Sequence, residues 1–168
     1  MDLIRSARNR WVAGATIRSF SAIKNHEGLS LKARPDKLWA VLRDFSNISK
    51  WHPDVKDCVL EGGGPGDRVG ATRAIHLQNG MAVREQVSAI SDKDMSYSYS
   101  VVESPFPLSY HSSTVSLAPA DDGTRTVATW YVEFSIPAGD GDQLARAIHQ
   151  TVILPGFEGL RKLGSAKM

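Results

Sequence analysis

Hydrophobic and polar residues alternate along two neighbouring segments of the chain, residues 68–77 and 81–90. Side chains of a β-strand point alternately to its two faces, so each segment is predicted to be a strand with one apolar face. The apolar face of the first strand consists of Val69, Ala71, Ile75 and Leu77, together with Arg73. The apolar face of the second strand consists of Met81, Val83, Val87 and Ala89, together with Glu85. Each predicted buried face therefore carries one charge.

The two strands are predicted to form a hairpin whose loop is Gln78-Asn79-Gly80. With three loop residues, Arg73 lies directly opposite Glu85 and both stay on the buried face. A two-residue Asn-Gly turn would pair inward residues with outward ones, so burial of one face favours the longer loop. A buried ion without a partner costs several kcal/mol. We expect either a partly polar cavity that contains this charge pair or a structural salt bridge near the open end of the sheet.

The pattern elsewhere predicts the remaining elements. Strands are expected at residues 26–33, 55–61, 95–103, 109–118 and 125–136. Pro35 is expected to open a first helix, and residues 44–51 a second short one. The apolar side of the first helix consists of Leu38, Val41, Leu42 and Phe45. Asp142 is expected to cap a long final helix, which Pro155 should bend or break near Leu154.

This order of one strand, two short helices, six strands and a long helix predicts the α+β class. Consecutive strands joined by turn-length links are expected to form a curved, seven-stranded antiparallel sheet. The amphipathic final helix must bury its apolar side against that sheet. Because one helix cannot fill the whole concave face, the sequence predicts a cavity between helix and sheet.

Composition sets the class of protein. The length of 168 residues suits one domain, and 42% hydrophobic with 23% charged residues is ordinary for a globular protein. Cys58 is the only cysteine, which excludes a disulfide framework and a thiolate metal cluster, and it is expected to be a small buried hydrophobic residue. No stretch has the apolar length needed to span a bilayer.

Charge is distributed unevenly along the chain. Residues 1–24 contain five of the 20 basic residues but one of the 18 acidic residues, which leaves 15 basic and 17 acidic residues in the other 144 positions. A slightly acidic body is not typical of a nucleic-acid-binding surface, so we expect no nucleic-acid partner.

Residues 1–22 are predicted to be a basic, amphipathic N-terminal extension of a domain that spans residues 23–168. Leu3, Ile4, Trp11, Val12 and Ile17 fall on one side of a helix in this segment. Its composition also suits a mitochondrial presequence with a processing point near Arg18-Ser19-Phe20. The simpler interpretation is a helix or tail packed on the domain of a cytoplasmic protein.

Several motifs together resemble a known superfamily. They are Trp39-Ala40-Val41-Leu42-Arg43-Asp44-Phe45, Trp51-His52-Pro53, Val83-Arg84-Glu85-Gln86, Tyr97-Ser98-Tyr99 and the final helix. With the order of elements over residues 26–164, they resemble the START-like, Bet v 1-like (SRPBCC) superfamily, labelled polyketide cyclase/dehydrase and lipid transport. The resemblance implies a helix-grip fold, in which the sheet grips the final helix around a hydrophobic ligand pocket.

Within that superfamily the loops are similar to those of the plant abscisic-acid receptors. Gln78–Ala82 occupies the position of their gate loop and Ser104–Leu108 that of their latch. His52 stands where those receptors have a ligand-binding lysine, and Glu85 and Tyr110 match pocket residues. The gate and latch sequences themselves differ, so the resemblance implies a gated pocket rather than hormone binding.

The predicted pocket draws on the inward faces of the strands and helix. Its expected polar anchors are Arg73, Glu85, Tyr110 and His52, where His52 alternatively caps local backbone. His149 lies on the apolar side of the final helix and is expected there as a core residue. The expected apolar contacts are Val55, Ile75, Leu77, Val83, Val87, Tyr97, Tyr99, Phe106, Trp130, Val132, Ile148 and Val152. We expect no cofactor and no metal, since His76 and His111 lack neighbours at ligand spacing and no nucleotide-binding motif is present.

Three functions fit this pocket. The first is binding of a small hydrophobic ligand, lipid-like or polyketide-like, that carries a polar group. The second is a polyketide cyclase or dehydratase, with Arg73 stabilising an enolate, Tyr110 or His52 transferring protons and Glu85 orienting the substrate. The third is contact with a protein partner through loops 78–82 and 104–108. All three rest on the same cavity.

Overall fold

The computed structural model describes residues 23–121, 123–137 and 139–166, so the predicted extension at residues 1–22 lies outside the described part. Its strands are β1 (Ile23–Leu31), β2 (Val55–Leu60), β3 (Thr72–Leu77), β4 (Ala82–Ser91), β5 (Ser96–Glu103), β6 (Tyr110–Pro119) and β7 (Thr126–Ser135). Its helices are α1 (Pro35–Leu42), the 3-10 segments η1 (Phe45–Lys50) and η2 (Glu61–Gly63), α2 (Gly141–Ile148), the π-helical η3 (His149–Ile153) and α3 (Leu154–Ser165).

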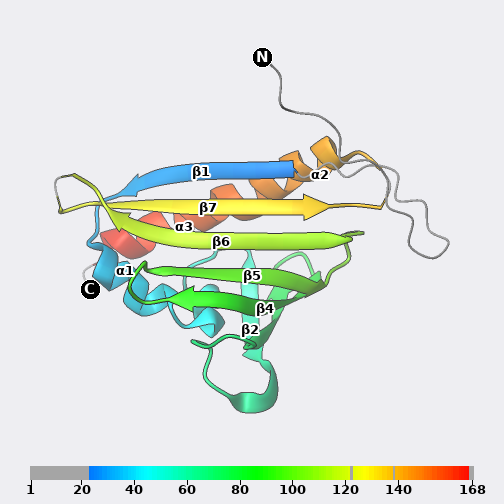
Figure 1. Ribbon diagram of the computed structural model, residues 1–168, viewed down its shortest axis with the longest axis horizontal. Coiled ribbons are helices and arrows are strands. Elements are labelled where there is room, and N and C mark those ends of the chain that lie inside the picture. The colour runs from blue at the N-terminus through cyan, green and yellow to red at the C-terminus, as the bar shows by residue number, and fades with distance from the viewer. Residues whose placement is uncertain (1–22, 122, 138, 167–168) are drawn as a thin grey trace.

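The strands form one antiparallel sheet in the order β1-β7-β6-β5-β4-β3-β2. Neighbours along the chain pair with each other from β2 to β7, and β1 returns to pair with β7. The sheet is curved, and the helical segment from α2 to α3 runs along one of its faces, behind β7 in Figure 1. The predicted α+β helix-grip architecture is confirmed.

The hairpin between β3 and β4 has the predicted register. Arg73 pairs with Glu85 and Ile75 with Val83. The N–H of Leu77 donates to the carbonyl oxygen of Met81 at 2.8 Å, which closes a three-residue loop. Gly80 in that loop has φ of 86°, in the left-handed region that glycine tolerates. Burial of one face therefore determines the loop length, as expected.

Two residues predicted on buried strand faces lie outside instead. Val69 is 61% exposed, because β3 begins only at Thr72, after a turn at Gly70 with φ of 85°. In β4 a bulge between Val87 and Ala89 shifts the pairing by one residue. The bulge leaves Ala89 exposed and places Ile90 opposite Tyr97, since an extra residue reverses the alternation of faces.

The core fills the end of the sheet that α1 and η1 cover. Leu38 and Leu42 of α1 are fully buried, and Val41 is half-buried. Aromatic side chains continue this layer, with the Phe45 and Tyr97 ring centroids 5.6 Å apart. Cys58 is partly buried, and this burial raises the pKa of its thiol. This end of the molecule is packed solid.

The final helix differs from its predicted form at both of the expected landmarks. Its N-cap is Asp140 rather than Asp142, and the Asp140 carboxylate accepts from the N–H of Gln143 at 2.9 Å. Before Pro155 the helix passes through the π-helical segment η3, where the N–H of Leu154 donates to the carbonyl of His149. Pro155 therefore follows a change of hydrogen-bond register rather than a break in the helix.

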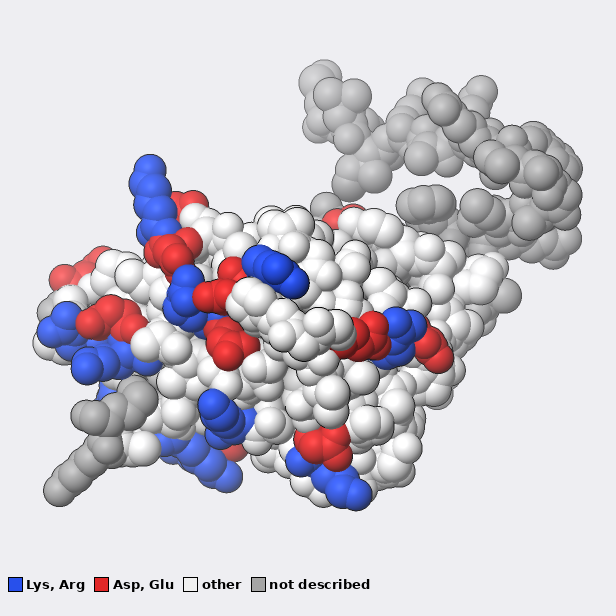
Figure 2. Space-filling view, turned by 90° about the horizontal axis from the view of Figure 1, so that it is seen from below, with Lys and Arg blue, Asp and Glu red and all other residues white. Residues whose placement is uncertain are grey.

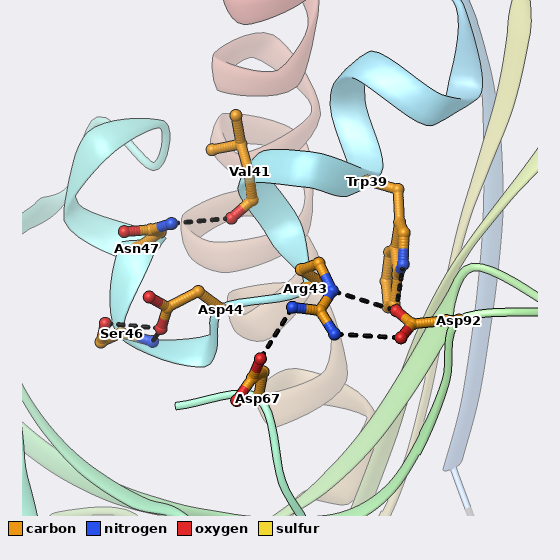
Figure 3. A network of polar contacts seen from close by, with 8 residues as sticks. All are labelled: Trp39, Val41, Arg43, Asp44, Ser46, Asn47, Asp67 and Asp92. Carbon is orange, nitrogen blue, oxygen red and sulfur yellow. Dashed lines mark hydrogen bonds and ion pairs between the residues drawn. The ribbon is translucent and has the colours of Figure 1, made fainter. Parts of the chain in front are cut away.

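A polar network fastens α1 to the sheet (Figure 3). Asp92, in the turn between β4 and β5, accepts from Trp39 Nε1 at 2.7 Å and from Arg43 at 2.9 and 3.0 Å. Arg43 also donates to Asp67 at 2.7 Å. Because these contacts join segments distant in sequence, they hold α1 and η1 in place over one end of the sheet.

Charged side chains of both signs lie side by side on the face shown in Figure 2. Among the exposed ion pairs, Arg84 contacts Glu61 and Glu103, and Arg161 contacts Glu158. Such exposed pairs contribute little to stability, so the core and its buried ion pair matter more. No helix in the described part of the chain has the length and apolar character that a membrane crossing needs.

Candidate functional site: a cavity between the sheet and the final helix

A cavity of about 590 Å³ opens beside the packed core, within the range usual for small-molecule sites. Apolar side chains from the sheet and from the helical segment around η3 form most of its wall. Its apolar lining consists of Ile48, Val55, Ile75, Leu77, Met81, Val83, Tyr99, Val101, Phe106, Leu108, Trp130, Val132, Ala147, Ile148 and Val152. Its polar lining consists of His52, Asp54, Gln78, Asn79, Glu85, Ser104, His111, Ser113, Gln150 and Thr151.

The exposed members of this lining mark where the cavity meets solvent. They are Gln78 and Asn79, in the loop after β3, and Gln150 and Thr151, in η3. Ser104, Phe106 and Leu108 belong to the loop between β5 and β6 and line the cavity as well. Loops 78–82 and 104–108 and the π-helical segment therefore border the cavity together.

The predicted charge pair lies at the inner wall. Arg73 is 1% exposed and Glu85 9% exposed. Arg73 Nε and Nη2 donate to the same oxygen, Glu85 Oε2, at 2.9 and 2.7 Å. No hydrogen bond is recorded for Glu85 Oε1 within the described residues, and Glu85 lines the cavity. One carboxylate oxygen thus holds the arginine while the other is left for a further donor.

Arg73 itself does not line the cavity. Its Nη1 donates to the Phe45 carbonyl oxygen at 2.5 Å, and its guanidinium carbon lies 3.5 Å from the centre of the Phe45 ring. Burial alone would lower the pKa of Arg73, but Glu85 together with Tyr97 and Tyr99 outweighs burial, and the pKa lies above its ordinary value. The cation is covered by Phe45, Tyr99 and Glu85 and is not available to a ligand.

His52 is buried with both ring nitrogens occupied. Nε2 lies 3.0 Å from the Val152 carbonyl oxygen, which can only accept, and Nδ1 accepts from the N–H of Asp54 at 3.3 Å. These partners select the neutral tautomer with its proton on Nε2. Burial lowers the pKa of His52, although the Val152 carbonyl pushes it the other way. His52 therefore joins the end of η1 to η3, which matches the backbone-capping alternative.

A second set of hydrogen-bonded polar groups links strands β5 and β6 at His111. The N–H of Val101 donates to His111 Nδ1 at 3.2 Å, so Nε2 carries the proton and donates to Ser113 Oγ at 3.1 Å. Burial lowers the pKa of His111 to about 4. Burial also raises the pKa of Tyr99, and the nearby Glu85 carboxylate adds to this effect. At neutral pH, His111 and Tyr99 are both uncharged.

Twelve of the predicted site residues line the cavity, and five do not. Tyr110 is 47% exposed on the outer face of β6, so its predicted place at the pocket is corrected. Tyr97 and Val87 are both buried in the core, where Tyr97 packs against Trp39 and Phe45. Arg73 is shielded from the cavity by Phe45, Tyr99 and Glu85. His149 follows Ile148 in the helix and is not part of the cavity lining, although Ile148 and Val152 are.

Strand alternation contained a signal that would have identified two of the missed residues. His111 and Ser113 share the inward face of β6 with Val115 and Leu117. Tyr110 has the opposite parity, which places it outside. Of the other missed positions, Val101 lies in β5, Ala147 in α2 and Ile48 in η1. The rest lie in loops or in the π-helical segment, where no regular period predicts the direction of a side chain.

Comparison with solved structures supports the same architecture. An uncharacterized protein from Bacillus thuringiensis aligns with a TM-score of 0.74 at 19% identity, covering 83% of this chain and 97% of that one. The protein XoxI from Bacillus cereus aligns with a TM-score of 0.75 at 20% identity, covering 84% and 94%. A protein from Nitrosospira multiformis aligns with a TM-score of 0.73 at 22% identity, covering 86% and 98%. At these identities the similarity establishes the fold alone.

The family follows from the sequence match. The profile described as polyketide cyclase / dehydrase and lipid transport matches residues 29–163, which is most of the chain. The finer similarity to abscisic-acid receptors stays a prediction. The curved sheet, the long final helix and the cavity between them agree with the family match. The chain belongs to the SRPBCC-type polyketide cyclase/dehydrase and lipid transport family.

Proposed function

We propose that this protein binds a small hydrophobic molecule with a polar group in the cavity below its final helix. The observation that carries the proposal is the cavity of about 590 Å³, whose wall is mostly apolar. Burial of apolar ligand surface there contributes roughly 25 cal/mol per Å². The few polar groups at the wall orient the ligand rather than supply most of the affinity.

Binding is favoured over the cyclase or dehydratase alternative by the positions and contacts of three side chains. Tyr110, one candidate for proton transfer, lies on the outer face of the sheet. His52, the other, already donates to one backbone group and accepts from another. Arg73, the candidate for enolate stabilisation, is covered by its partners. None of these three side chains is therefore placed to act on a ligand in the cavity, whereas the apolar wall is available.

Native mass spectrometry of the protein purified from its own host tests the proposal, together with titration of the neutral apolar probe N-phenyl-1-naphthylamine. We expect a co-purifying hydrophobic compound and a fluorescence increase on probe binding. Val83→Trp should abolish probe binding, because the indole occupies the cavity that Val83 lines. Absence of both a bound compound and probe binding would overturn the proposal.

Val102→Trp is the matched control for bulk. Val102 is 48% exposed on the outer face of β5, so the same indole there lies outside the cavity. This variant should bind the probe as the wild-type protein does. Equal loss of binding in both variants would mean that the probe does not report on the cavity.

A protein partner at loops 78–82 and 104–108 stays a separate prediction. Both loops border the cavity mouth, so a ligand in the cavity lies next to both of them. Ligand binding as proposed requires no such partner.

A further inference from the structure

The charges at the cavity wall are of one sign. Glu85 and Asp54 are its acidic residues, and no Lys or Arg lines it within the described part of the chain. His52 and His111 also line it, but burial lowers the pKa of both, so neither supplies a cation at neutral pH. Arg73, the nearest arginine, is already paired and shielded. The wall therefore offers no positive group to an anionic ligand.

The polar side chains of the inner wall lie together on three neighbouring strands. Glu85 of β4 pairs with Val101 of β5, and Tyr99 lies two residues before Val101 on the same face. Tyr99 in turn pairs with Ser113 of β6. The strip consists of Glu85, Tyr99, Ser113 and His111. It crosses a wall that is otherwise apolar at Ile75, Val101 and Val132.

This strip has a defined pattern of donors and acceptors. His111 Nε2–H donates to Ser113, which is the cross-strand neighbour of Tyr99. Glu85 Oε2 accepts both Arg73 bonds, and Oε1 has no recorded partner within the described residues. An ionised carboxylate oxygen is a strong acceptor and has nothing to donate. The ligand atom that satisfies Oε1 must therefore carry a hydrogen.

We propose that the cavity selects an uncharged ligand with a hydroxyl group, whose O–H donates to Glu85 Oε1, and rejects the corresponding carboxylate. This inference rests on the proposed function and specifies its ligand class. A carboxylate head would place a second negative charge beside Glu85 without a cation to offset it. An alcohol satisfies the free acceptor and brings no charge that must be desolvated.

Three ligands with the same ten-carbon chain test the preference for a hydroxyl group and the rejection of a carboxylate separately. They are 1-decanol, methyl decanoate and decanoate, each used to displace N-phenyl-1-naphthylamine from the wild-type protein at neutral pH. One hydrogen bond to a charged group corresponds to about a tenfold difference in affinity or more. Decanol should bind at least about tenfold more tightly than the ester, which cannot donate, and than the carboxylate.

Glu85→Gln tests the acceptor directly. Its amide oxygen can still accept from Arg73, which turns the NH₂ group toward the cavity. The advantage of decanol over the ester should then disappear, and decanoate should bind more tightly than it binds the wild-type protein. The control is Glu103→Gln, which makes the same charge change on an exposed side chain of β5 and should keep the wild-type order.

The outcomes distinguish this inference from the proposed function. Probe binding combined with decanoate or ester binding as tight as that of decanol overturns the hydroxyl preference but leaves ligand binding intact. Absence of probe binding together with absence of a co-purified compound overturns both. If circular dichroism shows that Glu85→Gln is not folded, the order of the three ligands on the wild-type protein decides the question.

Discussion

Arg73 is almost completely buried, and the hydrogen bonds recorded for its guanidinium end on Glu85 and on the Phe45 carbonyl oxygen. A guanidinium carries five donor hydrogens and cannot lose its charge inside a protein. Its burial is therefore tolerable only while the carboxylate is present. This dependence makes Glu85 a structural partner as well as a candidate ligand contact.

Glu85→Leu should lower the free energy of unfolding by about 3 kcal/mol, because it leaves Arg73 as a buried cation without its anion. Urea unfolding followed by circular dichroism measures the change. The double variant Arg73→Met/Glu85→Leu should recover much of the loss, since it removes the unpaired charge along with its partner. A single variant as stable as the wild-type protein would contradict the role of the pair.

Stability should also depend on pH through His111. Burial lowers its folded-state pKa from 6.5 to about 4, so the unfolded chain binds more protons between these values. The contribution of His111 to stability is therefore present above about pH 6.5, is lost progressively as the pH falls toward about 4, and changes no further below that. The slope in this window should approach ~1.4 kcal/mol per pH unit.

His111→Asn should reduce this slope, because asparagine can accept from the N–H of Val101 but does not titrate. His52 has its pKa shifted in the same direction and remains, so some of the slope persists. Urea unfolding at several pH values measures both proteins side by side. An unchanged slope in the variant would assign the pH dependence to other groups.

At the level of elements, the final helix closely approaches the segment after η1 at Gly159 and strand β7 at Gly156. A Cβ on Gly159 would lie 1.8 Å from the backbone carbonyl oxygen of Trp51, and one on Gly156 would lie 2.4 Å from the Trp130 ring. Glycine within a helix costs about 1 kcal/mol relative to alanine. Close packing explains why this helix nevertheless carries glycine at both positions.

Gly159→Ala should destabilise the protein by about 2 kcal/mol, since a backbone atom blocks the added methyl and the helix must shift. The effect should appear despite the better helix propensity of alanine. Lys162→Ala, at an exposed position of α3, is the control and should change stability little. Urea unfolding measures the free energy of unfolding of both variants. Equal stability of the two would show that the helix moves away from the Trp51 carbonyl oxygen at little cost.

The same helix also lines the cavity, where its π-helical segment contributes Gln150, Thr151 and Val152 to the wall. His52 bonds to the Val152 carbonyl oxygen and so ties this segment to the end of η1. Helix packing and cavity shape are therefore determined by the same contacts.

At the level of the whole molecule, the core of buried side chains lies beside a cavity of about 590 Å³. A ligand that binds the folded state alone stabilises it by RT ln(1 + [L]/Kd), which is about 2.7 kcal/mol at a concentration of 100 Kd. An empty apolar cavity also sacrifices contacts that a filled one makes.

Removal of co-purified ligand should therefore lower the melting temperature of the protein. Protein unfolded in denaturant, extracted with organic solvent and refolded should melt several degrees below the protein as purified. Addition of 1-decanol should restore part of the difference. Differential scanning calorimetry measures the shift, and native mass spectrometry confirms the loss of ligand. Loss of a bound compound with no change in melting temperature would contradict occupancy of the cavity.

Much of the inner wall was predictable because its pattern is local. Alternation along β3 and β4, the opposite charges of Arg73 and Glu85 and the demand that both stay buried were enough to specify the pairing and the loop. Short sequence motifs, together with the order of elements, were enough to indicate the family. Each of these features depends on residues close together in sequence.

The position of the cavity depends on contacts between segments that are distant in sequence. Tyr97 and Tyr99 have the same parity on β5, yet Tyr97 is enclosed by Trp39 and Phe45 while Tyr99 reaches the cavity wall. The bulge in β4, the π-helical turn before Pro155 and the capture of His52 by Val152 likewise arise from packing across the fold. A strand pattern states which face a side chain takes, but only the assembled helices determine whether that face meets another side chain or open space.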